Sequence, residues 1–168
     1  KAAKAEAVNV KKTIAYIREN MEVKIKDDEV ENVAALKVAM ESLIEKYNCN
    51  AAAIQCWNAL QTELGIMPCA ANALLNDEGI PVVCETDIHG AITALLVEAA
   101  GMGTTRSFFA DWTIRHPDIA NGELLQHCGP WPISIAREKA KLTYPLAFKH
   151  PGSLTAEAKH GEVTLSRF

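Results

Sequence analysis

The sequence predicts an α/β protein with a largely parallel sheet flanked by helices. Short apolar runs with the length and composition of buried strands occur at residues 51–57 and 80–84. Segments whose apolar residues recur at helical spacing lie before, between and after them. Because strands that alternate with helices usually pair in parallel, this order predicts one sheet covered by helices.

Two helices are predicted before the first strand. Residues 5–20 form the first, with Val8, Val10, Ile14 and Ile17 at mostly helical spacing. The second follows Asp27 and Asp28, which suit an N-cap and a first helical turn. Its apolar stripe consists of Val30, Val33, Leu36, Met40, Leu43, Ile44 and Tyr47.

The middle of the chain predicts two strands separated by helical pieces. Residues 51–57 are a short apolar run bounded by polar residues. Residues 60–75 carry one or two helical pieces, interrupted near Pro68 and ended by 76–79. Residues 80–84 are too short for a helix and too apolar for an exposed edge, so they predict the clearest strand.

The next segment predicts a helix at 87–100, stopped by Gly101. Its inward residues are expected to be Ile88, Ile92, Leu95, Leu96 and Val97. Further strands are expected at 107–110 and 123–127, on either side of the turn-rich residues 116–122.

The pattern changes after Pro130 and Pro132, which predicts a division into an α/β portion at 1–132 and a β-rich unit at 133–168. The closing residues 162–168 alternate as a strand does, without an obvious partner nearby. We therefore expect the chain to be a fragment, in which Val163, Leu165 and Phe168 are exposed because their cover is missing.

The composition predicts a soluble cytoplasmic protein. The 168 residues are 49% apolar and 23% charged, and 17 basic against 21 acidic residues give a net charge of −4. Such a surface is a poor partner for nucleic acid or an anionic membrane. No apolar run reaches membrane-spanning length, and no signal-peptide pattern opens the chain.

Five cysteines are present without a Cys-x-x-Cys pair, and most lie in apolar runs. They are interpreted as buried free thiols in a reducing compartment. A nucleophilic role stays open for Cys84 and Cys128, because each is next to an ionisable residue. The five are Cys49, Cys56, Cys69, Cys84 and Cys128.

Ionisable side chains follow each predicted strand, and ligands collect at the carboxyl ends of parallel strands. Carboxylates with one imidazole suit Mn²⁺ or Mg²⁺. Each residue also has a structural interpretation: a helix cap for Asp87, a solvated helix residue for Glu63, a turn or capping residue for Asp111 and a loop histidine for His127. Trp57 and Trp112 are candidates to stack on a ligand or to pack in the core. The strand-end residues are Gln61, Thr62, Glu63, Glu85, Asp87, Asp111 and His127.

Several stretches together resemble the L-fucose isomerase and L-arabinose isomerase superfamily, and more specifically its fucose-isomerase-like branch. The resemblance covers residues 55–168 and is carried by motifs in a fixed order. These are Ala-Ile-Gln-Cys-Trp at 53–57, Gln-Thr-Glu-Leu-Gly at 61–65, Pro-Cys at 68–69, Val-Cys-Glu-Thr-Asp-Ile-His-Gly-Ala at 83–91, Phe-Ala-Asp-Trp at 109–112, His-Cys-Gly-Pro at 127–130 and Gly-Glu-Val-Thr-Leu at 161–165.

The resemblance implies a fragment of a larger, three-domain, cytoplasmic, homo-oligomeric sugar isomerase of carbohydrate metabolism. It would hold the later part of the catalytic middle domain and the start of the C-terminal domain. By motif, the Mn²⁺ ligands fall on Glu63, Asp87 and His127, with Mg²⁺ or Co²⁺ as alternative metals, and Glu63 and Asp87 are the acid/base pair. Gln61, Trp57, Asp111 and Trp112 are expected near the substrate.

The implied reaction interconverts an aldose and a ketose through an enediolate, which is the chemistry of an intramolecular oxidoreductase. The fragment alone is expected to be inactive, because other domains complete the site. Two alternatives stay open. One is a non-catalytic sugar-binding or oligomerisation domain, and the other is a metal-dependent epimerase or aldolase that uses the same residues.

Overall fold

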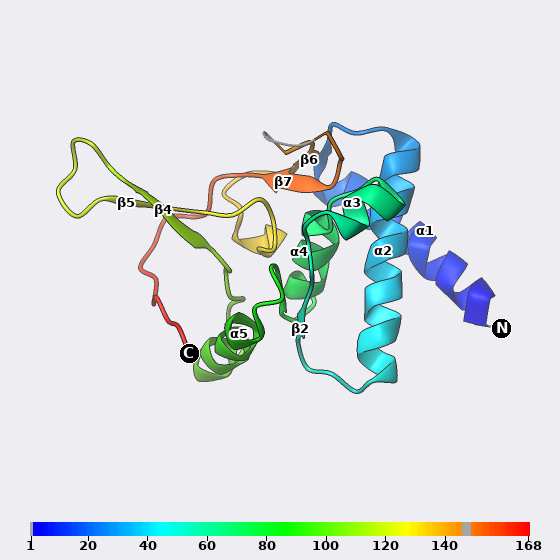
Figure 1. Ribbon diagram of the computed structural model, residues 1–168, viewed down its shortest axis with the longest axis horizontal. Helices are drawn as coiled ribbons and strands as arrows, with labels where there is room; N and C mark the ends of the chain where they lie inside the picture. The colour runs from blue at the N-terminus through cyan, green and yellow to red at the C-terminus, as the bar shows by residue number, and fades with distance from the viewer. Residues whose placement is uncertain (1, 146–148) are drawn as a thin grey trace.

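The computed structural model, which describes residues 2–145 and 149–168, has an α/β fold (Figure 1). Its fold class confirms the prediction. In chain order the elements are α1 (Ala2–Asn20), β1 (Glu22–Val23), α2 (Asp27–Lys46), β2 (Ala52–Ala53), α3 (Ala59–Leu64), α4 (Cys69–Asp77), β3 (Val82–Val83), α5 (Ile88–Ala100), β4 (Asp111–Arg115), β5 (Glu123–Gln126), the 3-10 turn η1 (Ile133–Ile135), β6 (Lys141–Thr143) and β7 (Ser153–Thr155).

The strands of the described residues form three small sheets rather than one large one. β2 and β3 pair in parallel, as the two apolar runs predict. β1 pairs in parallel with β6, which pairs antiparallel with β7. β4 and β5 form a separate antiparallel hairpin, which projects away from the helices in Figure 1. The sheet is therefore parallel only in part.

The main core lies between α1, α2, α4 and the β1–β6–β7 sheet. Ile17, Val30 and Val33 from the first two helices are fully buried against Leu142 and Leu154 of β6 and β7. Burying an aliphatic side chain of this size stabilises the fold by about 1.5–3 kcal/mol. Strands from residues 133–168 thus share a core with helices from the first part of the chain, while the predicted domain division at 132/133 stays a prediction.

The predicted helices are confirmed, including the break at Pro68, which separates α3 from α4. Asp27 and Asp28 lie in the first turn of α2, whose N-cap is Lys26. In the predicted stripe of α2, Val30, Val33, Met40 and Ile44 are buried, whereas Leu43 and Tyr47 are exposed.

The predicted inward face of α5 is wrong for three of its five residues, whereas Leu95 and Val97 are half-buried. Ile88, Ile92 and Leu96 are exposed, whereas the small residues Gly90, Ala91, Thr93 and Ala94 are buried. α5 is in contact with β2 and β3, and a β-carbon on Gly90 would lie 2.7 Å from the Phe109 ring. The Phe109 ring fits against α5 at this point because Gly90 has no side chain.

The predicted strand at 107–110 is also wrong, since these residues precede β4 as irregular chain. The predicted strand at 123–127 is confirmed as β5. Residues 162–168 are extended but form no strand ladder, and they run to α5, where the Phe168 N–H donates to Thr93 Oγ1 at 2.9 Å. As expected, Val163, Leu165 and Phe168 are exposed.

All five cysteines are free. The prediction of burial is confirmed for Cys56, Cys69 and Cys84, whereas Cys49 is exposed and Cys128 is half-buried. Among the described residues, no helix combines the length and the apolar character that crossing a membrane requires.

Candidate functional site

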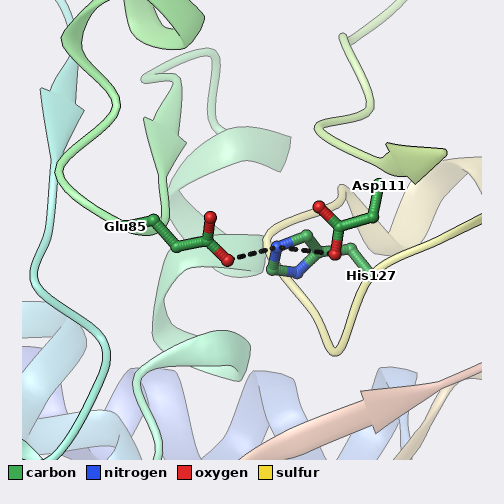
Figure 2. A group of neighbouring side chains, drawn as sticks. All are labelled: Glu85, Asp111 and His127. Carbon is green, nitrogen blue, oxygen red and sulfur yellow. Dashed lines mark ion pairs between the residues drawn. The ribbon is translucent and has the colours of Figure 1, made fainter. Parts of the chain in front are cut away.

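Three side chains converge where the β4–β5 hairpin joins the rest of the molecule. Glu85, Asp111 and His127 each offer one ligand atom, and these atoms lie within 4.8 Å of one another. No other such group of acidic, histidine or cysteine side chains occurs in residues 2–145 and 149–168. Figure 2 shows the two carboxylates reaching toward the imidazole from opposite sides.

Glu85 lies in a strained turn that directly follows β3. Its φ is +65°, and that of Thr86 is +56°, so two consecutive residues other than glycine adopt the left-handed conformation. This conformation costs about 1–2 kcal/mol for each such residue. The Thr86 N–H donates to Ile54 O at 3.1 Å, and the Thr86 hydroxyl donates to Gln55 Oε1 at 2.9 Å. These bonds hold the turn, and the turn directs the Glu85 carboxylate toward His127.

Asp111 and His127 are brought together by the hairpin. Asp111 is the first residue of β4 and pairs with Gln126, the last residue of β5. His127 follows directly. Because the strands are antiparallel, the start of one lies beside the end of the other. The ladder therefore places this carboxylate and this imidazole side by side.

His127 is buried, with its side chain 3% exposed. The Phe109 ring packs against the imidazole with 5.3 Å between centroids, and Nδ1 lies 3.7 Å from Cys128 Sγ. The second ring nitrogen, Nε2, is buried and has no hydrogen-bond partner. A buried polar atom without a partner costs about 1–3 kcal/mol, so it indicates that a ligand belongs at this position.

The spacing of the ligand atoms suits a divalent cation. His127 Nε2 lies 3.8 Å from Glu85 Oε1 and 3.9 Å from Asp111 Oδ2. Both distances are too long for hydrogen bonds. Donor atoms about 2.1 Å from a shared ion are separated by roughly 3.0–4.2 Å, depending on the angle between them. Two carboxylates and one imidazole fit Mn²⁺, Mg²⁺ or a similar ion.

Asp87 lies outside this cluster and caps α5. Its Oδ1 accepts a hydrogen bond from the Gly90 N–H at 2.9 Å, and its carboxylate forms an ion pair with Arg167. The hydrogen bonds from Arg167, together with that from Gly90, lower the pKa of the Asp87 carboxyl. The structure thus gives Asp87 the capping role that the sequence offered as its alternative.

The other predicted site residues are spread over α3 and β4. Glu63 is exposed on α3 and is not part of the cluster. Gln61 is buried on the same helix, and its side-chain amide donates to Cys56 O at 3.5 Å. Trp57 precedes α3 and Trp112 lies on β4, and both are exposed. Of the predicted metal ligands, only His127 is in the cluster, where it meets Asp111, which was predicted to lie near the substrate.

Glu85 was named among the strand-end residues but not among the predicted ligands. The signal that identifies it is its position, two residues after the buried strand β3, where Glu85 and Thr86 adopt the left-handed conformation. Strained conformations of this kind are concentrated at functional sites. A single sequence does not reveal a positive φ at glutamate.

A wide cavity of about 1800 Å³ opens beside the cluster, between α5, the chain at 103–110, η1 and the residues at 158–167. None of the three cluster residues lines it. Phe109 lies at the boundary, since it lines the cavity and packs against the His127 ring. Phe109 is therefore a point of contact between the cavity lining and the cluster.

Comparison with known proteins finds relatives that are sugar isomerases by name. The chain is 31% identical over 143 residues to the sulfoquinovose isomerase of Alkalicoccus urumqiensis. The matched region covers 84% of this chain and 32% of the relative. It is 27% identical over 146 residues to the sulfoquinovose isomerase of Priestia aryabhattai, with the same coverage of both chains. It is 29% identical over 100 residues to the sulfoquinovose isomerase of Clostridium sp. (strain MSTE9), a match that covers 59% of this chain and 22% of the relative.

The chain spans about a third of the length of the first of these relatives. No family model matches it. The name of the relatives describes a sugar isomerase, which is the class that the sequence motifs imply, and mentions neither fucose nor arabinose. The similarity therefore places this chain among relatives of sugar isomerases.

Proposed function

We propose that this chain is the metal-binding part of an aldose–ketose isomerase in which Glu85, Asp111 and His127 hold a divalent cation. The observation that carries the proposal is the buried, unpartnered Nε2 of His127 between two carboxylates. The similarity to sulfoquinovose isomerases supports the reaction class.

The donor set favours Mn²⁺, with Mg²⁺ or Co²⁺ as alternatives. Such an ion, when bound, polarises a carbonyl and supports loss of a neighbouring proton by stabilising negative charge on oxygen. His127 would serve as a neutral ligand through Nε2, and Glu85 and Asp111 would balance the charge of the ion. The contact between Nδ1 and Cys128 Sγ fixes the ring with Nε2 facing the carboxylates.

Conversion of an aldose to a ketose moves a proton from C2 to C1 of the sugar, so a base must accept the C2 proton. Glu85 and Asp111 are about half exposed, which leaves their second carboxylate oxygens open to a sugar. The sequence motifs assign the acid/base roles to Glu63 and Asp87 instead. Asp87, paired with Arg167 and with its pKa lowered, is a weaker base in this arrangement.

We propose that the whole protein acts on a sulfonated aldose, by analogy with the name of its relatives, and that it is a cytoplasmic homo-oligomer. The exposed apolar side chains of the hairpin support oligomerisation or coverage by further chain. Trp112, Ile114 and Leu124 are 65%, 63% and 49% exposed. Large contiguous apolar patches are usually covered in a functional assembly.

The metal site is tested by titrating the 168-residue chain with Mn²⁺ and following the loss of the free-ion electron paramagnetic resonance signal. We expect Glu85→Gln, Asp111→Asn and His127→Ala each to weaken binding by at least about tenfold. Glu63→Gln and Asp87→Asn are the matched controls, which change a carboxylate in the same way outside the cluster, and they should bind as the wild type does.

The opposite result, with binding lost in the Glu63 and Asp87 variants and kept in the Glu85 and Asp111 variants, would show that the motif-based ligand set is right. The reaction is tested separately, on the longer protein that contains this chain, by incubation with sulfoquinovose and product analysis. A ketose supports the isomerase. A C3 or C4 epimer, or cleavage products, would identify epimerase or aldolase chemistry instead.

A further inference from the structure

Four of the five cysteines gather behind the candidate metal site. Cys56 and Cys69 are close enough to the Cys84 thiol to influence its pKa, which is raised, and Cys69 Sγ lies 3.5 Å from Cys128 Sγ. Cys128 is the residue after His127. The cysteines come from four separate parts of the sequence, so the fold alone brings them together.

The backbones of Cys69 and Cys128 are held by one short segment, residues 151–154. The Ala70 N–H, next to Cys69, donates to Gly152 O at 2.8 Å. The Ser153 hydroxyl donates to Cys128 O at 2.8 Å, and the Leu154 N–H donates to the same oxygen at 3.3 Å. Both cysteines are therefore fixed against β7, and their separation does not depend on a flexible loop.

Gly129 makes the close approach of the two chain segments possible. Its φ is +148°, and a β-carbon at this position would lie 2.5 Å from the β-carbon of Cys69. No real side chain fits in that space. The chain after Cys128 thus passes directly over Cys69, which brings the two thiols into contact.

We propose that Cys69 and Cys128 are a redox-active pair that a peroxide converts into a disulfide. Cys128 is the more exposed residue of the two, and its sulfur attacks hydrogen peroxide to form a sulfenic acid and release one water. The Cys69 sulfur then attacks the Cys128 sulfur, the S–O bond breaks, and a second water leaves with the Cys69 proton. Two thiols and one peroxide give one disulfide and two waters.

Little movement is needed, because the sulfurs have to approach from 3.5 Å to about 2.05 Å. The second step is expected to be slow. The hydrogen bond with Cys128, together with burial, raises the pKa of the Cys69 thiol, and a thiol is less reactive than its thiolate. The pair should therefore respond to sustained oxidation rather than to brief exposure.

Disulfide formation has a consequence for the metal, and this part rests on the proposed function. Cys128 Sγ lies 3.7 Å from His127 Nδ1. When the sulfur moves toward Cys69, it leaves this position and pulls on the residue that carries the imidazole. Oxidation should thus displace Nε2 from the two carboxylates and weaken Mn²⁺ binding.

The bond is tested by treating the folded 168-residue chain with hydrogen peroxide, alkylating remaining thiols in denaturant, and mapping peptides by mass spectrometry without reduction. We expect a peptide linking Cys69 to Cys128, with Cys49 and Cys56 alkylated, and reversal by dithiothreitol. A dominant link from Cys84 to Cys56 or Cys69 would overturn the proposal. So would Cys128 oxidised to a sulfinic acid while Cys69 is alkylated.

The coupling is tested by Mn²⁺ titration after the peroxide is removed. The oxidised wild type should bind at least about tenfold more weakly and recover with dithiothreitol. Cys69→Ser should bind Mn²⁺ normally and lose this response, whereas Cys49→Ser, which changes an exposed cysteine, should respond as the wild type does. Unchanged binding by a chain that carries the disulfide overturns the coupling. Absence of Mn²⁺ binding in the reduced wild type instead overturns the proposed function. In that case peptide mapping of the wild type still shows whether the disulfide forms.

Discussion

The region built from α1, α2, α4 and the β1–β6–β7 sheet differs sharply from the region built from α5 and the β4–β5 hairpin. In the first, Ile17 and Leu142 are fully buried. In the second, Ile88, Trp112 and Ile114 are more than 60% exposed. The first region therefore supplies most of the apolar burial that stabilises the fold, while the second presents apolar side chains at its surface.

The candidate site lies where the two regions meet. Glu85 follows β3 in the packed part of the molecule, whereas Asp111 and His127 belong to the hairpin. A two-stranded hairpin is at best marginally stable alone. Any ion that joins these three side chains would therefore also attach the hairpin to the body of the protein.

The largest expected difference between the regions is in the effect of truncating an aliphatic side chain. Leu142→Ala removes a fully buried side chain from the main core and should lower the free energy of unfolding by about 2–5 kcal/mol. Ile114→Ala on the hairpin should change it by about 0.5 kcal/mol or less. Urea unfolding followed by circular dichroism measures both, and equal losses would mean that the hairpin is as well packed as the core.

A smaller effect, of opposite sign, is expected at the turn that joins the regions. Asparagine tolerates the left-handed conformation better than glutamate does, so Glu85→Asn should raise the free energy of unfolding by about 0.5–1 kcal/mol. Glu85→Gln removes the same charge and keeps the strain, which makes it the matched control. If the two variants unfold at the same urea concentration, the turn stores no strain.

The smallest effect concerns the ion pair that joins α5 to the closing segment. The pKa of Asp87 is lowered in the folded state, so the unfolded chain binds the proton more tightly and the pair stabilises the fold at neutral pH. This contribution, less than about 1 kcal/mol for an exposed pair, should be complete above the usual aspartate pKa of about 3.9. This stabilisation should be lost as the pH falls through the lower pKa that Asp87 has in the folded state.

Asp87→Asn isolates this contribution, because asparagine is also a good N-cap. Wild type and variant should differ in stability at pH 7, and the difference should shrink as the pH falls below about 3.9, as measured by urea unfolding at each pH. A difference that persists unchanged at pH 3 would show that the charge of Asp87 is not its source.

Helices and buried strands were predictable where the apolar pattern alone decides the structure. The stripe of α2 and the run at 80–84 are examples, since their residues contact the core directly. The pattern failed on part of α5, where Gly90 and Ala94 are buried while Ile88 and Leu96 are exposed. Periodicity identifies the two faces of a helix, but it does not show which face packs against which neighbouring element.

Glu85, Asp111 and His127 were all among the strand-end residues, but the sequence did not show that these three lie together. Asp111 was expected after a strand and instead begins one. It reaches His127 because the hairpin is antiparallel, a pairing that depends on the turn at 116–122 and not on either strand alone. Glu85 and Asp87 both follow β3, and only backbone conformation determines that the first faces His127 while the second caps α5.

The parallel pair of β1 and β6 has a consequence for the order of events during synthesis. Glu22 and Lys141 come from opposite ends of the chain, and the Glu22 N–H donates to Ala140 O at 2.8 Å. β1 therefore leaves the ribosome long before its partner strand exists. Contacts between residues so distant in sequence form slowly. α1, α2 and α4 can pack on one another earlier, but the part of their apolar surface that β6 and β7 cover stays exposed until these strands arrive.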